Sequence, residues 1–378
     1  MTLLLAATCL RPAITTVGPV LDQIGASTGS GDALLGLLAS MPLLAFALVS
    51  PFVAPAAARL GVDRLLLLAL LALAVAIAVR SLPGGVSLWA GTLGIGAAVA
   101  IGNVLLPAVV KRDFPHRITL VTGLYSASMG AFAALASGTV VPLGDALGGW
   151  RPALAVWAVL PFLVVLLWWL RPATPPSVAG VLPSKPPTTL LRSAGAWQIT
   201  VFFGLQSAAF YTLVTWLPTI EQTLGVDMHR AGLHLFVYQV LGMLSGIAIS
   251  VLMQGRDDQR LPAFMVGVPV LVAALGLLML PELALLWIAM AGLGSGSSLT
   301  LSLSLVAIRT TTAQETAALS GMAQSLGYLI SAAGPLLAGI AFDWSGSRVP
   351  VLQLVAGIAV AQIVLSLWAG RTAPVRVA

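Results

Sequence analysis

One arginine stands inside the first long apolar run of the sequence, in the stretch AATCLRPAITTVGPV at residues 6–20. A charged side chain near the centre of a bilayer costs about 2.5–3.5 kcal/mol on insertion scales, so it normally faces a protein interior or a water-filled path. The guanidinium of Arg11 carries a rigid fork of donors that suits planar, carboxylate-like anions. Arg11 could bind the anionic or electron-rich end of a solute, or it could reach toward the interface and donate to carbonyls that Pro12 leaves free. We favour the first interpretation, because no acidic residue stands near the middle of any apolar run.

Uncharged polar side chains occupy the middle of several other apolar runs. Gln324 and Tyr328, for example, are four residues apart and share one face of a helix. Such groups could hydrogen-bond a small polar ligand around Arg11, or they could tie neighbouring helices together at well under about 2 kcal/mol each. The residues predicted to complete a substrate cavity are Asn103, Tyr125, Gln206, Tyr211, Gln239, Gln324 and Tyr328.

Titratable groups inside the apolar runs are scarce. The 12 acidic residues all fall at the ends of the runs or in the links between them, which disfavours simple proton antiport through a membrane carboxylate. His234 lies within a run but about one turn from its end, and the preferred interpretation is an ordinary hydrogen-bonded or interfacial histidine. The sequence shows no phosphate-binding Gly-Lys-Ser/Thr stretch, no metal-spaced histidine pair and no plausible Ser/His/Asp set, and Cys9 is its only cysteine. We therefore expect neither an enzyme, nor an ATP-driven pump, nor a metal or other cofactor.

The composition indicates an integral membrane protein. Of the 378 residues 59% are hydrophobic and 8% are charged, and the mean hydropathy is +1.03, whereas about a quarter of the residues in a soluble domain are charged. The first run lacks a basic flank and a cleavage site, so it is interpreted as a spanning helix and not as a signal peptide. Since roughly 20 apolar residues cross a bilayer as a helix, the sequence predicts an all-α fold with twelve spans, at 3–24, 33–58, 64–82, 86–111, 117–142, 151–171, 196–222, 230–254, 261–280, 282–309, 315–341 and 349–370.

A stretch rich in Pro, Ser and Thr separates the sixth predicted span from the seventh, and its composition is typical of a linker. We expect two six-helix bundles, residues 1–171 and 196–378, joined by a linker over residues 172–195. The two halves also repeat weakly, which indicates a parallel duplication with both bundles in the same orientation. Adding 198 to a position carries Gly96 to Gly294, Lys111 to Arg309, Gly123 to Gly321 and Asp145 to Asp343.

Lysine and arginine are distributed unevenly between the two sides of the predicted spans. The side that includes the linker and the C-terminal tail holds 13 of them, and the other side holds Arg80, Arg151, Arg230 and Arg348. Cytoplasmic loops carry the excess of basic residues in membrane proteins. Both termini and the linker are therefore predicted to be cytoplasmic.

The twelve spans, the six-plus-six repeat and the central linker together resemble the major facilitator superfamily. The usual signature between spans 2 and 3 is only partly present in APAAARLGVDR (residues 54–64), which keeps Arg59 and Gly61 but has Ala58 and Asp63 where an acidic and a basic residue are usual. Further stretches resemble the cyanate permease and nitroimidazole transporter family, in which Asn usually stands where this chain has Cys9. These stretches are LRPAITTVGPV (10–20), GNVLLPAVVKRDFP (102–115), YTLVTWLPTI (211–220) and LSGMAQSLGYLISAAGPLLAGIAFD (319–343).

The resemblance implies a secondary transporter that moves a small anionic or polar organic solute, such as cyanate or an azole, by alternating access. The two bundles would rock about a substrate site between them that contains Arg11. The cytoplasmic entrance to this site would be gated near Arg59, Gly61, Arg64 and Arg309. The expected partners are the solute and the lipid bilayer, with no nucleic acid, and the protein is expected to work as a monomer in a bacterial inner membrane. Two alternatives stay open: a multidrug exporter with a larger apolar cavity that tolerates loss of Arg11, and a transport-dead membrane sensor that docks a cytoplasmic partner on residues 171–195.

Overall fold

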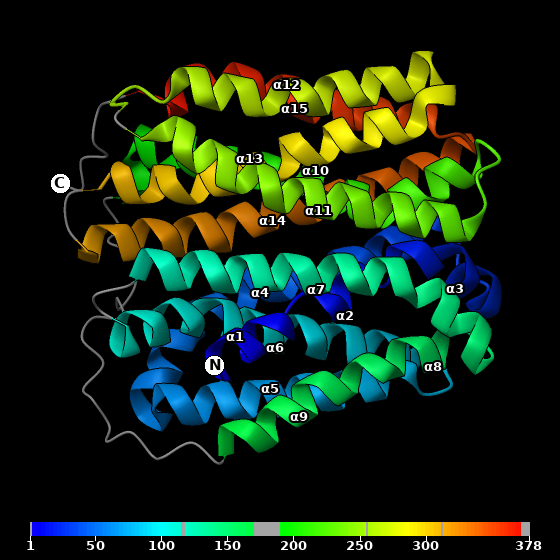
Figure 1. The fold of residues 1–378 in the computed structure, drawn as a ribbon, viewed down its shortest axis with the longest axis horizontal. Coiled ribbons are helices and arrows are strands. Elements are labelled where there is room, and N and C mark those ends of the chain that lie inside the picture. The colour runs from blue at the N-terminus through cyan, green and yellow to red at the C-terminus, as the bar shows by residue number, and fades with distance from the viewer. Residues whose placement is uncertain (1, 115–117, 170–189, 255, 311–312, 372–378) are drawn as a thin grey trace.

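A computed structural model describes residues 2–114, 118–169, 190–254, 256–310 and 313–371 (Figure 1). Helices make up nearly all of these residues, and no strand occurs among them. Twelve segments are long and apolar enough to cross a membrane. The predicted all-α architecture with twelve spans is thereby confirmed.

The helices follow the predicted spans closely. The first half contains α1 (Thr2–Thr8), α2 (Pro12–Thr15), η1 (Gly18–Val20), α3 (Leu21–Thr28), α4 (Asp32–Leu60), α5 (Val62–Ser81), α6 (Gly85–Asp113), α7 (Ile118–Leu147), α8 (Trp150–Ala155), η2 (Val156–Ala158) and α9 (Val159–Trp169). The second half contains η3 (Leu190–Arg192), α10 (Ala194–Gln222), α11 (Met228–Met253), α12 (Arg260–Met279), η4 (Pro281–Leu283), α13 (Ala284–Ile308), α14 (Ala313–Ser345) and α15 (Val349–Ala369). Most of the predicted linker lies outside the described residues.

The first span is broken into α1, α2, η1 and α3, where the sequence analysis predicted one continuous helix. Pro12 and Pro19 each stand in the first turn of a new segment, because proline has no amide hydrogen to continue the preceding one. Gly18 lies so close to α10 that a Cβ atom on it would be 2.1 Å from the carbonyl oxygen of Val214. The two prolines and the close packing of Gly18 against α10 therefore break the helix, although the apolar run is long enough for a continuous one.

Arg80 satisfies a carbonyl group that this break leaves free. Its side chain is buried, and its Nη1 donates to the carbonyl oxygen of Ala13 at 2.5 Å. In an unbroken helix this carbonyl would accept from the amide of Val17, which bonds to Ile14 instead. The sequence analysis counted Arg80, near the end of the predicted span 64–82, with the basic residues of the side opposite the linker. The structure buries its side chain there, because the freed carbonyl group of Ala13 needs a partner.

The two halves of the chain lie on opposite sides of the molecule, with α1 to α9 on one side and α10 to α15 on the other (Figure 1). They meet where α4 packs against α14 and α7 packs against α11. The Oγ of Ser40 on α4 donates to the carbonyl oxygen of Ala332 on α14 at 2.7 Å. The Nε2 of Gln239 on α11 donates to the carbonyl oxygen of Ala133 on α7 at 3.0 Å and to the Oγ of Ser137 at 2.7 Å. Buried hydrogen bonds thus join the halves.

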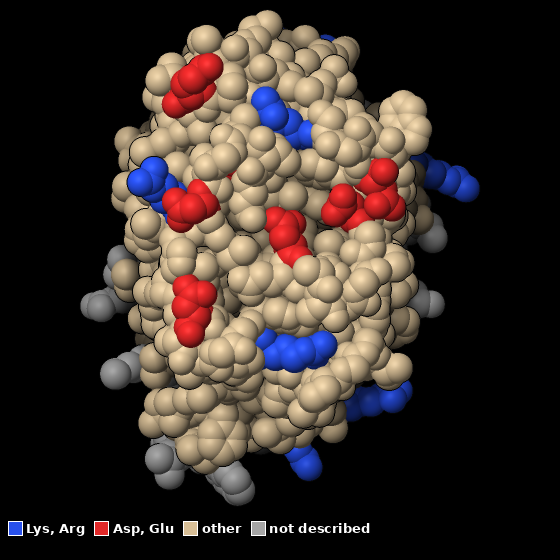
Figure 2. Space-filling model, turned by 90° about the vertical axis from the view of Figure 1, so that its right-hand side faces the viewer, with Lys and Arg blue, Asp and Glu red and all other residues tan. Residues whose placement is uncertain are grey.

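We call the end of the molecule where α9 ends and α10 begins the linker end. At the opposite end the halves are in contact. The Oδ1 of Asp343 accepts from the amide of Asp32 at 3.2 Å, and the Nε2 of His229 is 2.9 Å from the Oδ2 of Asp145. Figure 2 shows this end, with acidic side chains spread across it.

Toward the linker end the halves separate. Gly130 of α7 is close to α11, since a Cβ atom on it would be 3.5 Å from the Met243 side chain. Gly123 lies two turns earlier on the same face of α7, yet a Cβ atom there would meet no heavy atom within 4 Å. The equivalent glycine of the repeat, Gly321 on α14, also borders open space. Gly321 shares the face of α14 that meets α4 through Ala332 and Gly339. The spacing of α7 from α11 and of α14 from α4 therefore widens toward the linker end.

Candidate functional site

Arg11 occupies the break between α1 and α2. Its carbonyl oxygen accepts from the amides of Ile14 at 3.0 Å and Thr15 at 3.1 Å, so its backbone begins α2. The side chain is half-buried, and the guanidinium carbon lies 5.5 Å from the centre of the Phe210 ring on α10. A cation over an aromatic face gains about 0.5–2 kcal/mol, with the larger values away from water. The charge of Arg11 is thereby held toward the second half of the chain.

The Arg11 guanidinium carries no carboxylate partner in the described part of the chain, where the ion pairs all involve other residues. An unpaired cation that is partly removed from water is costly unless water or an anion accompanies it. The donors of Arg11 are consequently available to a visiting anionic or electron-rich group.

Aromatic rings of the second half surround this charge. Tyr211 on α10, Tyr238 on α11 and Tyr328 on α14 all lie within electrostatic reach of Arg11. The Phe210 ring centre is 5.1 Å from that of Tyr211 and 6.0 Å from that of Tyr238, distances at which aromatic rings attract each other. We call these five residues the Arg11 cluster.

Tyr328 links the Arg11 cluster to both halves. Its ring makes edge contacts with Phe46 on α4, at 4.9 Å between centres, and with Phe203 on α10, at 5.3 Å. Tyr211, Tyr328 and Tyr125 of α7 all pack against the same apolar core in the first half of the chain. Groups from both halves thus converge at mid-span, where a site between two repeats is expected.

The structure brings three of the predicted substrate residues, Arg11, Tyr211 and Tyr328, into the Arg11 cluster. Tyr125 packs against the same core as these tyrosines. Asn103 is half-buried on α6, next to Gly102, which packs closely against the Leu10 side chain.

The three predicted glutamines make other contacts. Gln239 is buried and bonded to α7, so it joins helices across the two halves. The Nε2 of Gln206 donates to Ser207 at 2.6 Å, and the Nε2 of Gln324 donates to Ser320 at 3.1 Å, both within their own helices.

Sequence reasoning missed Phe210 and Tyr238. Each adjoins a predicted site residue, Tyr211 or Gln239, but adjacent residues on a helix face different directions. The Phe210 ring gives no polar signal inside an apolar run, whereas Tyr238 carries the same hydroxyl group as the three predicted tyrosines and was overlooked. Only the packing of α10 and α11 against the first span shows that both face Arg11.

The predicted gating residues differ in their surroundings. Arg59 and Arg64 are exposed at the linker end. Gly61 is the single residue between α4 and α5, and its φ of 82° is a conformation that favours glycine. Arg309 is buried at the end of α13, where its Nη2 donates to the carbonyl oxygen of Ala369 at 2.6 Å and burial lowers its pKa.

Asp63, in the partial signature segment at residues 54–64, forms an ion pair with Arg112 of the same half. The guanidinium of Arg112 on α6 donates to both carboxylate oxygens of Asp63, at 2.5 and 2.9 Å, and its Nε donates to Asp113 at 2.7 Å. The hydrogen bond to Asp63 raises the pKa of Arg112, so the arginine keeps its charge. It fixes α5 against α6 at the linker end.

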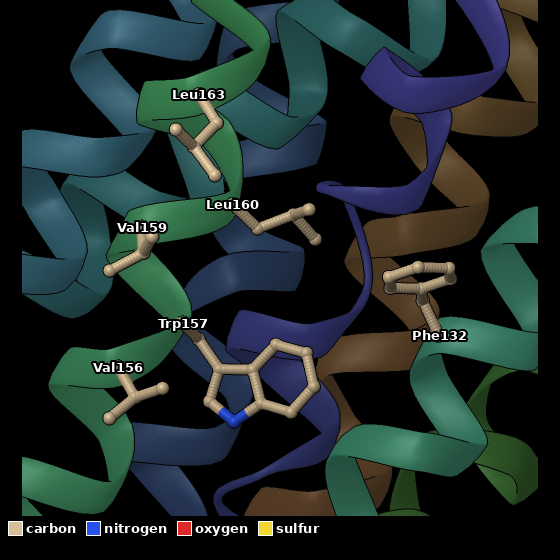
Figure 3. Close-up of a pocket in the computed structure, with 6 residues that line it drawn as sticks. All are labelled: Phe132, Val156, Trp157, Val159, Leu160 and Leu163. Carbon is tan, nitrogen blue, oxygen red and sulfur yellow. The ribbon is translucent and has the colours of Figure 1, made fainter.

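An apolar pocket of about 210 Å³ lies in the first half, lined by residues of α7, η2 and α9 and by none of the Arg11 cluster (Figure 3). The Trp157 indole and the Phe132 ring point toward each other across it. Val156 and Val159 on its rim are exposed, which places the pocket at the lipid-facing side of the span. The lining side chains are apolar apart from the indole nitrogen of Trp157, so the pocket gives an anionic group little to bind.

Comparisons with known proteins identify the family of this chain. The sequence pattern of the Major Facilitator Superfamily matches residues 3–335. The chain is 40% identical over 376 residues to the 2-nitroimidazole transporter of Escherichia coli (strain K12), covering 99% of this chain and 95% of that one. It is 26% identical over 378 residues to the cyanate transport protein of the same organism, covering 100% and 97%.

The fold is similar to the crystal structure of a D-xylose–proton symporter, with a TM-score of 0.76 and 13% identity over 99% of this chain and 97% of the other. Among the described residues, no group of three or more His, Cys, Asp or Glu side chains could hold a metal ion. The suspected family resemblance is confirmed by the sequence match and by the relatives. This chain belongs to the major facilitator superfamily and is a secondary transporter of small solutes, not an enzyme.

Proposed function

We propose that this transporter moves a small, planar or linear, electron-rich organic solute, an azole or a cyanate-like anion, and that the Arg11 cluster binds it. The observation that carries the proposal is the guanidinium of Arg11, which has no carboxylate partner among the described residues and lies over Phe210 between the two halves. The guanidinium fork would bind the charged or electron-rich end of the solute. The aromatic rings would stack on its flat face.

The names of the relatives support this solute class. Nitroimidazole offers the two oxygens of a planar nitro group, and cyanate is a small linear anion; both present acceptors and no bulky apolar body. A site made of one free arginine and several aromatic rings suits such solutes. Tyr125, Asn103 and Gln324 are proposed to complete the cavity toward the linker end.

Transport is proposed to occur by alternating access. Residues 1–171 and 196–378 would rock as two bundles joined by a cytoplasmic linker over 172–195, with the linker end and both termini on the cytoplasmic side of a bacterial inner membrane. The halves are in contact at the opposite end, and the spacing between them is wider at the linker end. This supports a state whose site is closed to the extracytoplasmic side and open to the cytoplasm. Arg59, Arg64 and Arg309 would lie around the inner opening.

The proposal can be tested by uptake into proteoliposomes. Purified wild-type protein is compared with Arg11→Gln and Arg11→Lys for uptake of 2-nitroimidazole and cyanate, and with Arg256→Gln as an exposed-arginine control outside the proposed site and gate. We expect loss of uptake with Arg11→Gln, reduced uptake with Arg11→Lys and wild-type uptake with Arg256→Gln. Uptake that is unchanged in Arg11→Gln would overturn the proposed role of Arg11. Transport of neutral apolar dyes by that variant would favour the multidrug alternative.

A further inference from the structure

The side chain of Arg80 extends from the end of α5 toward the middle of the span. Arg80 is the second-last residue of α5, and side chains on a helix tilt toward its N-terminus, which for α5 is the linker end. Arginines near the end of a spanning helix usually reach outward to the interface. Arg80 is instead 1% exposed, and its Nη1 donates to the carbonyl oxygen of Ala13 at 2.5 Å. Its charge is therefore held inside the first half, away from water.

One edge of the Arg80 guanidinium is unused. Its Nε and Nη2 have no hydrogen-bond partner among the described residues, and these two atoms lie side by side on the planar group. Arg112 uses the same edge to bind the carboxylate of Asp113, at 2.7 Å from Nε and 3.5 Å from Nη2. The ion pairs within the described part of the chain involve other residues than Arg80. Since arginine keeps its charge at neutral pH, Arg80 is a buried cation that no described carboxylate neutralises.

Arg80 and Arg11 approach the same short helix from different sides. Arg11 is the N-cap residue of α2, and Ala13, which accepts from Arg80, follows it by two residues. The Arg11 side chain reaches toward Phe210 in the second half, whereas Arg80 belongs to α5 in the first half. Like charges repel each other more strongly away from water, and an anion beside α2 is attracted by both of them. A solute without net charge gains nothing comparable.

We propose that Arg80 is a specificity-determining residue, whose buried charge makes the solute site favour anionic over neutral solutes without touching the solute. This inference rests on the proposed function, in which the Arg11 cluster binds the solute, and it adds the charge state that the site prefers. Arg11 makes the direct contact, and Arg80 adds to the positive potential around it. At an effective dielectric constant of about 20, a full charge one or two side-chain lengths away changes the affinity for an anion by about three- to tenfold.

Arg80 also helps to hold α2 in place, and this role must be separated from the effect of its charge. Loss of the bond to Ala13 would disturb α2 and weaken the binding of anionic and neutral solutes alike. A second bond still fixes the helix, since the Oγ1 of Thr15 donates to the carbonyl oxygen of Ala133 on α7 at 3.2 Å. Loss of the charge weakens the binding of anions alone. The ratio of the two dissociation constants therefore isolates the charge.

Titration calorimetry with two small probes tests the proposal. Cyanate carries a full negative charge at neutral pH, and 1-methyl-2-nitroimidazole has no ring N–H group to lose and stays neutral. The Kd of each probe is measured for purified wild type, Arg80→Gln, Arg80→Lys and Arg11→Gln. Arg151→Gln is the matched control, because Arg151 lies at the same end of the same half and also donates to a backbone carbonyl, that of Leu82, but is partly exposed to water.

We expect Arg80→Gln to raise the Kd for cyanate about three- to tenfold more than the Kd for the neutral azole. Arg80→Lys keeps the positive charge and should keep the wild-type ratio of the two constants. Arg151→Gln should leave both constants unchanged, because water screens its charge.

An unchanged Kd for cyanate in Arg80→Gln would overturn the proposal, and so would an equal rise for both probes, which is the result of a purely structural role. If Arg80→Gln does not fold, loss of the wild-type ratio in Arg80→Lys would overturn it. Failure of the proposed function gives a different result: wild type binds neither probe, or Arg11→Gln leaves both constants unchanged, and the proposal for Arg80 then falls with it.

Discussion

The guanidinium carbon of Arg11 lies 5.5 Å from the centre of the Phe210 ring, and these two residues come from opposite halves of the chain. A solute held between them would contact both halves at once. Relative movement of the halves would then change the contacts of the solute, which is the requirement for alternating access. The following predictions test this arrangement and the fold that supports it.

Phe210→Leu should weaken solute binding without removing Arg11. The substitution keeps an apolar side chain but removes the aromatic face, so we expect the Kd for 2-nitroimidazole to rise about three- to tenfold, equivalent to about 0.5–1.5 kcal/mol of cation–π and stacking energy. Titration calorimetry on the purified protein measures this change. Phe162→Leu, a matched control at a residue 50% exposed on α9, should leave the Kd unchanged. Equal effects of the two substitutions would contradict the assignment of Phe210.

Gln239→Leu should favour separation of the halves at the opposite end. It removes two buried hydrogen bonds to α7, and such bonds average about 0.6 kcal/mol each within membranes. We expect the ratio of open to closed protein to rise roughly three- to eightfold. Spin labels on Val86→Cys and Met279→Cys in Cys9→Ala protein, at exposed positions one in each half at this end, measure the ratio as long against short distances. Gln353→Leu, at an exposed position on α15, is the matched control. An unchanged ratio would show that Gln239 does not hold the halves together.

Gly61→Ala should destabilise the corner between α4 and α5 through backbone strain alone. A Cβ atom at Gly61 would meet nothing within 4 Å, but its φ is 82°. Such a conformation costs a non-glycine residue about 1–3 kcal/mol. Thermal unfolding in detergent should show a lower midpoint for Gly61→Ala than for Gly85→Ala, a position with similar open space and no positive φ. Equal midpoints would mean that the α4–α5 corner relaxes without cost.

The spans could be predicted from the sequence because twelve apolar runs of membrane-crossing length leave little freedom for their placement. Arg11 could be identified because one charge in such a run is costly. The breaks around Arg11 were not predicted, because Pro12 and Pro19 are compatible with a kinked but continuous helix. Their effect depends on Arg80, which is distant in the sequence and satisfies the freed carbonyl of Ala13.

The candidate site was only partly predictable, because the contacts that define it also join segments that are distant in the sequence. Polarity indicated Tyr211 and Tyr328, whereas Phe210 carries no polar signal. Polarity also indicated Gln239, whose actual partner is a backbone carbonyl 106 positions away on another helix. Glu221 stands near a helix end in the sequence, but the structure buries it in contact with His234 of α11. Contacts between distant segments therefore decide which polar residues face a solute.

The most direct test of the central claim is the thermal stability of purified wild type, Arg11→Gln and Arg256→Gln with and without 2-nitroimidazole or cyanate. A ligand at 100 times its Kd stabilises the folded protein by about 2.7 kcal/mol. We predict that the solute raises the unfolding midpoint of the wild type and of Arg256→Gln but leaves that of Arg11→Gln unchanged. An equal rise in all three proteins would contradict the claim that Arg11 binds the transported solute.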